Sequence, residues 1–173
     1  NAFTPESLNY YEDSAEELAI INYTSGTSGF SKGVMIPYRA IFSNMEFAKK
    51  VLPGLDHTKN MVSMLPSAHM YGLMFELLYE LSVGAHVHFL SRVPSPKIIM
   101  QAMSDVKPYL VIAVPLVIEK IYKSKVKPIL EKEGVKVLMK LPVLSQMVMN
   151  KIKEELVNAF GGEFYEVIIG GAA

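Results

Sequence analysis

The sequence predicts an α/β fold, a mainly parallel sheet with helices on both faces. The main observation is that short apolar runs rich in Val, Ile and Leu alternate along the chain with segments whose apolar residues recur every three or four positions. The composition agrees with this class, because half of the 173 residues are hydrophobic and a fifth are charged, as in a globular domain with a sizeable core.

The first half of the chain begins with a strand. Residues 18–24, LAIINYT, are expected to form a buried strand, and residues 34–37, VMIP, a short extended continuation after a Gly-rich loop. Regularly spaced apolar residues then predict an amphipathic helix over 41–52, which a Pro-Gly pair ends. The run 61–65 predicts the next strand, and a loop separates it from an apolar helix that ends near residue 83.

The second half repeats this alternation of strands and helices. Ser95 before Pro96 is a favourable N-cap and predicts a helix that runs to about Val106. Two longer amphipathic helices are expected over 116–133 and 143–160. The strands expected in this half are 85–90, 109–114 and a terminal run that begins at Tyr165.

Charge and apolar runs exclude some classes of function. The 17 basic and 17 acidic residues balance, which argues against a dedicated nucleic-acid binder. There is no cysteine, so neither disulfides nor thiolate chemistry are available. The longest uncharged apolar run, 108–118, contains two prolines and is much shorter than the ~20 residues that cross a bilayer. We therefore expect a cytoplasmic protein, with association with a membrane as an open alternative.

The charges are unevenly distributed along the chain. Residues 1–17 carry five acids and no base, and we interpret them as an acidic leader whose first two residues could be a cloning remnant. Residues 119–140 carry seven lysines and three glutamates. A solvated helix face explains this excess, and contact with an anionic membrane surface or ligand is the alternative that remains open.

The composition of the segment TSGTSGFSKG, residues 24–33, is favourable for binding an anion. Its glycines can adopt positive φ and let the backbone approach a ligand, and its hydroxyls and Lys32 can bind phosphate oxygens. The order of Lys and Gly differs from the Walker A motif, so this is not that nucleotide-binding loop. From the residues alone, phosphate binding is favoured and a flexible linker remains the alternative.

Four separated segments resemble signatures of the adenylate-forming enzymes, which include acyl-CoA synthetases, luciferases and the adenylation domains of peptide synthetases. YTSGTSGFSKGV, residues 23–34, is similar to the family pattern Y-T-S-G-T-T-G-x-P-K-G-V, with serines at 28 and 31 as departures. MLPSAHMYG at 64–72 resembles L-P-x-x-H-x-x-G, and VPLVIEKIY at 114–122 resembles a run of long-chain fatty-acyl-CoA ligases. AFGGEFYEVIIGGAA at 159–173 resembles the family's F-G-G segment, with Ile169 and Ala173 as departures.

The resemblance implies a ligase that activates a fatty acid, of the long-chain class, with Mg-ATP and passes the acyl group to coenzyme A. It implies that residues 18–173 form an incomplete N-terminal ATP- and acyl-binding domain. Thr27 would be a Mg²⁺ ligand, and Lys32 would pair with the departing pyrophosphate. The residues implied to hold the phosphates of ATP are Thr24, Ser25, Gly26, Thr27, Ser28, Gly29, Lys32 and Gly33.

The same resemblance assigns a second group of residues. His69, together with Gly72, would lie at the acyl and CoA pocket, where His69 is expected to shape the pocket rather than to take a proton. Gly170, Gly171 and Ala172 would form a turn that contacts the adenine and the acyl chain, where only small residues fit.

The later signatures of the family are not in this sequence, so we expect a fragment that contains no catalytic residue and is inactive alone. Its implied partners are ATP, a fatty acid and coenzyme A, without nucleic acid. Two alternatives remain, an adenylation domain that loads a carrier-protein thiol and a non-enzymatic module that binds a nucleotide or lipid.

Overall fold

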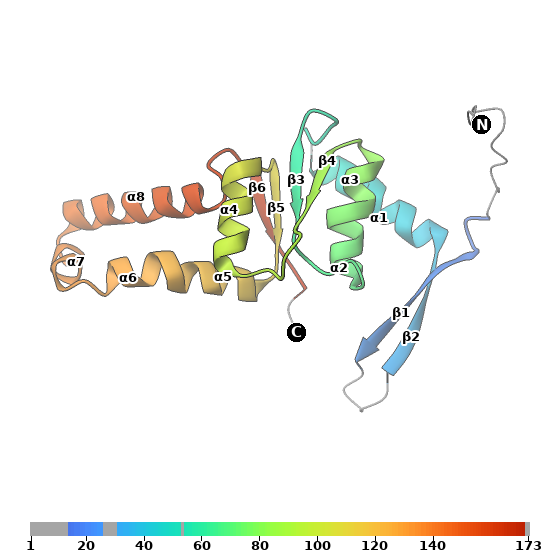
Figure 1. Cartoon of the computed structure of the whole chain (residues 1–173), viewed down its shortest axis with the longest axis horizontal. Coiled ribbons are helices and arrows are strands. Elements are labelled where there is room, and N and C mark those ends of the chain that lie inside the picture. Colours follow the sequence, from blue (N-terminus) through green and yellow to red (C-terminus); the bar gives the residue numbers. More distant parts are fainter. Residues whose placement is uncertain (1–13, 26–30, 53, 172–173) are drawn as a thin grey trace. The chain divides into compact units, whose positions relative to one another are not determined.

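The computed structural model describes residues 14–25, 31–52 and 54–171 (Figure 1). Contacts divide the chain into two compact units, Asn1–Phe47 and Ala48–Ala173. Each unit is described by itself below.

The first unit contains a β-hairpin. Strand β1 (Leu18–Ser25) pairs with β2 (Ser31–Pro37) in antiparallel register, and helix α1 (Tyr38–Val51) follows directly. The sequence predicted extended structure only from residue 34, but cross-strand pairing holds Ser31–Gly33 in the strand despite their low β-propensity. The predicted strand over 18–24 is present, but the prediction that it is buried is wrong, since Tyr23 is 70% exposed and Ile21 48%. A two-stranded ribbon buries little of either face.

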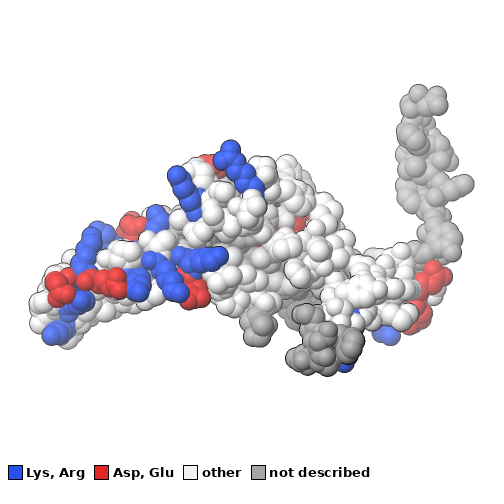
Figure 2. Space-filling view, turned by 60° about the horizontal axis from the view of Figure 1, so that its bottom comes forward, with Lys and Arg blue, Asp and Glu red and all other residues white. Residues whose placement is uncertain are grey.

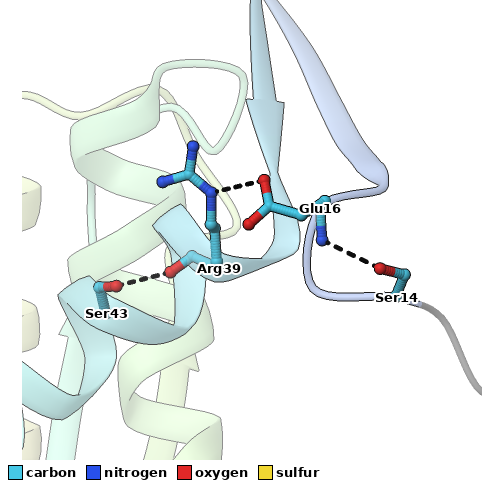
Figure 3. Close-up of polar contacts among 4 residues, drawn as sticks. All are labelled: Ser14, Glu16, Arg39 and Ser43. Carbon is cyan, nitrogen blue, oxygen red and sulfur yellow. Dashed lines mark hydrogen bonds and ion pairs between the residues drawn. The ribbon is translucent and has the colours of Figure 1, made fainter.

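Polar contacts tie the segment before β1 to the start of α1 (Figure 3). The Arg39 Nε donates to Glu16 Oε2 at 2.8 Å, and the Arg39 backbone N donates to the Ala15 carbonyl at 2.9 Å. On either side of this pair, the Glu16 N donates to Ser14 Oγ and the Ser43 hydroxyl donates to the Arg39 carbonyl. Because the ion pair is solvent-exposed, we attribute the connection mainly to the backbone bond.

The second unit is built on parallel strands. Strand β3 (Asn60–Ser63) pairs with β4 (His86–Phe89), and β5 (Leu110–Ala113) pairs with β6 (Glu166–Ile169), both in parallel (Figure 1). The Tyr109 N donates to the Asn60 carbonyl at 2.9 Å, which connects the start of β5 to the start of β3. The predicted parallel α/β class is confirmed for this unit.

Helices follow the strands as the sequence predicts, except that two of them contain a π-helical turn and that a short helix over Glu133–Leu138 was not predicted. The helix expected to end near residue 83 consists of α2 (Met70–Leu73), a π-helical turn (Met74–Leu78) and α3 (Tyr79–Ser82). The helix expected over 116–133 is divided in the same way, because a π-helical turn and a proline lie within it. Its parts and the remaining helices are α4 (Pro96–Val106), α5 (Pro115–Ile121), a π-helical turn (Tyr122–Val126), α6 (Lys127–Leu130), α7 (Glu133–Leu138) and α8 (Pro142–Ala159).

The core lies on both faces of the strands. On one face, Val62 and Val111 pack with side chains of α4, α5 and the end of α8. On the other face, Met61 and Ile112 pack with α3 and with the last turn of α1. Neighbouring residues of one strand point to opposite faces, so β3 and β5 each contribute to both clusters. The prediction of helices on both faces of the sheet is confirmed.

Helix α4 begins as its sequence predicts. The Ser95 side chain is at the N-cap and accepts a hydrogen bond from the Ile98 N at 3.3 Å, with Pro96 in the first turn. We expect Ser95→Ala to lower the free energy of unfolding by about 1 kcal/mol, because one N–H at the helix start loses its acceptor. Urea denaturation measures the change, and Ser91→Ala, in the exposed turn before it, is the control that should leave stability unchanged.

Within the described ranges, no helix is both long enough and apolar enough to cross a membrane.

Candidate functional site

The described ends of the Gly-rich segment lie in the β1–β2 hairpin. Thr24 is opposite Lys32 across the two strands, and Ser25 is opposite Ser31. Gly26, Thr27, Ser28 and Gly29, predicted to bind phosphate, lie outside the described residues. The hairpin therefore fixes where the segment begins and ends, and brings Lys32 level with Thr24.

The pairing of Thr24 with Lys32 has a chemical consequence. Residues directly opposite each other on antiparallel strands place their side chains on the same face. Both residues are exposed, so a hydroxyl and an ammonium group are presented together at the end of the ribbon. These two donors suit the oxygens of a phosphate group.

Gly33 packs against the opposite strand of the hairpin. It lies in β2 and is not among the glycines with positive φ in the described chain, so it does not use the positive φ that a glycine permits. An added Cβ would come within 3.1 Å of Ile21 Cγ2 and 3.4 Å of Tyr23 Cε1. The missing side chain leaves room for these two neighbours, which lie on the face of the hairpin that is opposite to Thr24 and Lys32.

The second group of predicted residues surrounds a cavity of about 310 Å³ in the larger unit. His69 precedes α2 in an extended conformation, and its backbone N donates to the Pro66 carbonyl at 3.0 Å. Gly72 is buried in the first turn of α2. The residues that line the cavity are Leu65, Pro66, His69, Tyr71, Gly72, Val114 and Gly171.

The Gly170–Gly171 turn lies against a tyrosine ring. A Cβ added to Gly170 would be 2.8 Å from the Tyr71 ring, and one added to Gly171 would be 3.3 Å from it. Gly171 also has a φ of +66°, which disfavours other residues. The Tyr71 hydroxyl donates to the Ile168 carbonyl at 3.3 Å and so fixes the ring beside the turn. Ala172 is outside the described residues.

Two buried glutamates support this region, and our sequence reasoning missed them. Glu76 is 1% exposed, and its Oε2 accepts hydrogen bonds from the Leu65 N at 2.6 Å and the Met64 N at 2.9 Å. Ser63 contributes a third, longer bond at 3.3 Å. Glu76 therefore holds the backbone where β3 leads into the cavity wall.

Glu80, one turn further along, is fully buried, and neither of its carboxylate oxygens has a hydrogen-bond partner in the described part of the chain. Burial raises the pKa of Glu80 from its ordinary value of 4.5 to about 8, and the nearby charge of Glu76 adds to the effect. Burial also raises the pKa of Glu76, to about 7, although its three hydrogen bonds oppose the shift.

The structure thus brings His69, Gly72 and Gly171 to one cavity, with Gly170 packed on the tyrosine in its wall. Lys32, Thr24 and Gly33 belong to the hairpin of the other unit. A signal for the glutamates existed in the sequence. The run from Met70 to Val83 has acids four residues apart but no polar face on which both could be solvated.

Comparison with known proteins identifies relatives of this chain. In Homo sapiens, the protein named Long-chain-fatty-acid--CoA ligase ACSBG2 is 30% identical over 122 residues, which make up 70% of this chain and 18% of the relative. Long chain acyl-CoA synthetase 8 of Arabidopsis thaliana is 31% identical over 124 residues, 68% of this chain and 17% of the relative. The chain thus spans less than a fifth of the length of either protein.

Solved structures share the fold at lower sequence identity. The ATP-bound RpMatB-BxBclM chimera B1 matches with a TM-score of 0.67 and 22% identity over 96% of this chain and 26% of its own. The inhibitor-bound N-terminal domain of FACL13 from Mycobacterium tuberculosis matches with a TM-score of 0.64 and 16% identity, over 95% of this chain and 33% of its own. The sequence pattern of the family described as AMP-binding enzyme matches residues 4–172, nearly the whole chain. The chain belongs to this family.

Proposed function

We propose that the chain is part of an AMP-forming acid–thiol ligase that activates a fatty acid with ATP and transfers it to coenzyme A. The family match over residues 4–172 supports the adenylating chemistry. The names of the two relatives that are 30% and 31% identical support a long-chain fatty acid as the substrate. The observation that carries the proposal in the structure is the alignment of Lys32 with Thr24 across the hairpin.

The reaction has two steps. The fatty-acid carboxylate attacks the α-phosphorus of ATP, the bond to the β-phosphate breaks, and pyrophosphate leaves with the electron pair. The CoA thiolate then attacks the acyl carbon and displaces AMP. In the first step, negative charge builds on the departing phosphates, where a fixed ammonium group and N–H donors stabilise it. We assign this role to Lys32, with the Thr24 hydroxyl beside it.

Bound Mg²⁺ would further neutralise the phosphates. We assign Thr27 as the Mg²⁺ ligand in this chain. We assign phosphate binding to Ser25, Gly26, Ser28 and Gly29. Thr27 lies outside the described residues.

We assign the cavity around His69 to the acyl and thiol end of the reaction. Its wall is mostly apolar, and the glycines at 72 and 171 allow their neighbours in the wall to pack closely against the backbone. His69 shapes this cavity through its backbone position, which the bond to Pro66 fixes. The turn that contains Gly170, Gly171 and Ala172 would contact the adenine and the acyl chain.

We expect Lys32→Ala to weaken ATP binding at least tenfold, because a charge-assisted bond to phosphate contributes about 1.5–3 kcal/mol. Isothermal titration calorimetry of the chain with ATP measures this change. Lys97→Ala, which removes an exposed lysine from α4, is the matched control and should bind ATP as the unsubstituted chain does. An equal loss in both variants would mean that Lys32 has no specific role.

Activity is tested in the complete polypeptide that contains these 173 residues. Exchange of labelled pyrophosphate into ATP that depends on a fatty acid, followed by formation of an acyl-CoA thioester, is the expected result. If exchange is followed by transfer of the acyl group only to a carrier-protein thiol, the acceptor is the carrier protein and not coenzyme A. Nucleotide binding without any exchange would falsify the enzymatic proposal and favour a binding module.

A further inference from the structure

Residues 115–159 form a helical arm that extends from the sheet. It consists of α5, a π-helical turn, α6, α7 and α8, and Figure 1 shows α7 at the end of the arm that is remote from the strands. We call residues 132–143, which include α7 and the start of α8, the arm tip. The whole arm belongs to the second unit.

The arm tip exposes large apolar side chains. Val143 is 76% exposed, Val137 60% and Leu141 50%, and the adjacent Leu138 and Met139 are each 37% exposed. They occur within seven consecutive residues, so they form one contiguous group rather than scattered exceptions. A contiguous group of exposed apolar side chains is typical of a surface that binds a protein, a ligand or a membrane.

The arm is also basic. It contains nine lysines and five glutamates, an excess of four positive charges in a chain whose net charge is zero. Figure 2 shows lysine side chains gathered over the arm, at the left of that view, with glutamates among them. Ion pairs engage Lys123, Lys127 and Lys136. Lys132 and Lys140, at the tip, have no ion-pair partner among the described residues.

A groove of about 500 Å³ continues the apolar surface along the arm between α6, α7 and α8. Its charged lining residues are Lys132, Lys151 and Glu155, so a net positive charge borders an apolar floor. The apolar residues of the groove are Ile129, Val135, Leu138, Leu144, Met147 and Val148.

We propose that the arm tip docks on the surface of an anionic phospholipid bilayer, with its apolar side chains among the upper acyl chains and its lysines at the headgroups. The combination of residues favours a bilayer over a protein partner, because lysine is depleted in protein–protein interfaces whereas an apolar surface bordered by lysine is typical of helices that lie in a membrane interface. This proposal is independent of the proposed enzymatic function.

Vesicle co-sedimentation tests the proposal. We expect the chain to bind vesicles of phosphatidylcholine and phosphatidylglycerol in a 3:1 ratio, and to bind pure phosphatidylcholine vesicles at least tenfold more weakly. The triple variant K132Q/K140Q/V143S should bind the anionic vesicles at least tenfold more weakly than the unsubstituted chain, since each lysine near an anionic leaflet strengthens binding about fivefold. Raising the salt concentration should weaken binding further.

A matched control separates the tip from general surface charge. The variant R92Q/K97Q/V93S also removes two exposed basic groups and one exposed valine, which is 85% exposed, but from the segment that precedes and begins α4. It should bind vesicles as the unsubstituted chain does, and circular dichroism should show both variants folded. Equal losses in the two variants, equal binding to neutral vesicles, or unchanged binding by the tip variant would each overturn the proposal.

Two further results would also count against a bilayer. Concentration-dependent self-association that the tip substitutions abolish, without vesicle binding, would assign the surface to a second copy of the chain. Failure of the complete polypeptide to bind anionic vesicles would show that other residues of that polypeptide cover the tip.

Discussion

Replacing Glu80 with Gln should remove a large part of the pH dependence of stability between pH 5 and pH 9. In the folded chain, burial raises the pKa of Glu80 to about 8, against an ordinary value of 4.5. A group whose pKa is raised on folding contributes stability that is complete below pH 4.5 and is lost as the pH rises through 8. The loss in free energy of unfolding should reach roughly 3 to 5 kcal/mol by pH 9.

The physical reason is that ionised Glu80 is unpartnered. Neither of its oxygens accepts a hydrogen bond in the described residues, and Glu76 adds a like charge. A Gln side chain has the same size and does not ionise, so its desolvation penalty is the same at every pH. Glu76 titrates in a similar range, with its pKa raised to about 7, so some pH dependence should remain in the variant.

Urea denaturation of the chain at pH 5, 7 and 9 measures these free energies. Glu154→Gln, an exposed glutamate of α8, is the control, and its variant should show the same pH dependence as the unsubstituted chain. If Glu80→Gln leaves the difference between pH 5 and pH 9 unchanged, Glu80 is solvated or paired in solution.

The elements that the sequence predicted well are those with local signals. The apolar runs of β3 and β5 and the Ser95–Pro96 start of α4 each contain their own pattern, and the structure has them within one or two residues. The start of β2 was missed, because the Ser-Lys-Gly residues that open it are ordinary loop residues until the strand opposite them is known. Strand pairing is a long-range property that periodicity does not contain.

The residues of the candidate site also fall into those with a local sequence signal and those that only the fold brings together. The His-x-x-Gly spacing of His69 and Gly72 is local and was recognised by its resemblance to a family signature. The packing of Gly170 on Tyr71 joins residues 99 positions apart, which only the fold can bring together. The hydrogen-bond partners of Glu76 were also beyond the sequence, although the apolar run around it was a signal of its burial. Those partners are backbone N–H groups, which leave no mark in a sequence.

The same substitution, Gly to Ala, should have opposite effects at two helical positions of this chain. Gly134 in α7 is exposed, and an added Cβ would meet nothing within 4 Å. We expect Gly134→Ala to raise the free energy of unfolding by about 0.5–1 kcal/mol, the gain in helix propensity alone. Gly72→Ala brings the same gain but places its Cβ 2.7 Å from the Pro66 carbonyl oxygen. Here we expect a net loss of about 1–3 kcal/mol, because the backbone must move to relieve the overlap.

The Pro66 carbonyl that a Cβ on Gly72 would overlap also gives Gly72 an indirect role in positioning His69. The Pro66 oxygen accepts the hydrogen bond of the His69 N, so displacing it should shift the backbone that positions His69 beside the cavity. Denaturation of both variants measures the stabilities, and the amide chemical shift of His69 reports the second effect. That shift should change in Gly72→Ala and stay constant in Gly134→Ala. A stabilised Gly72→Ala variant with an unchanged His69 amide would mean that the first turn of α2 lies further from Pro66 in solution, and that the glycine is not required by the geometry of the cavity wall.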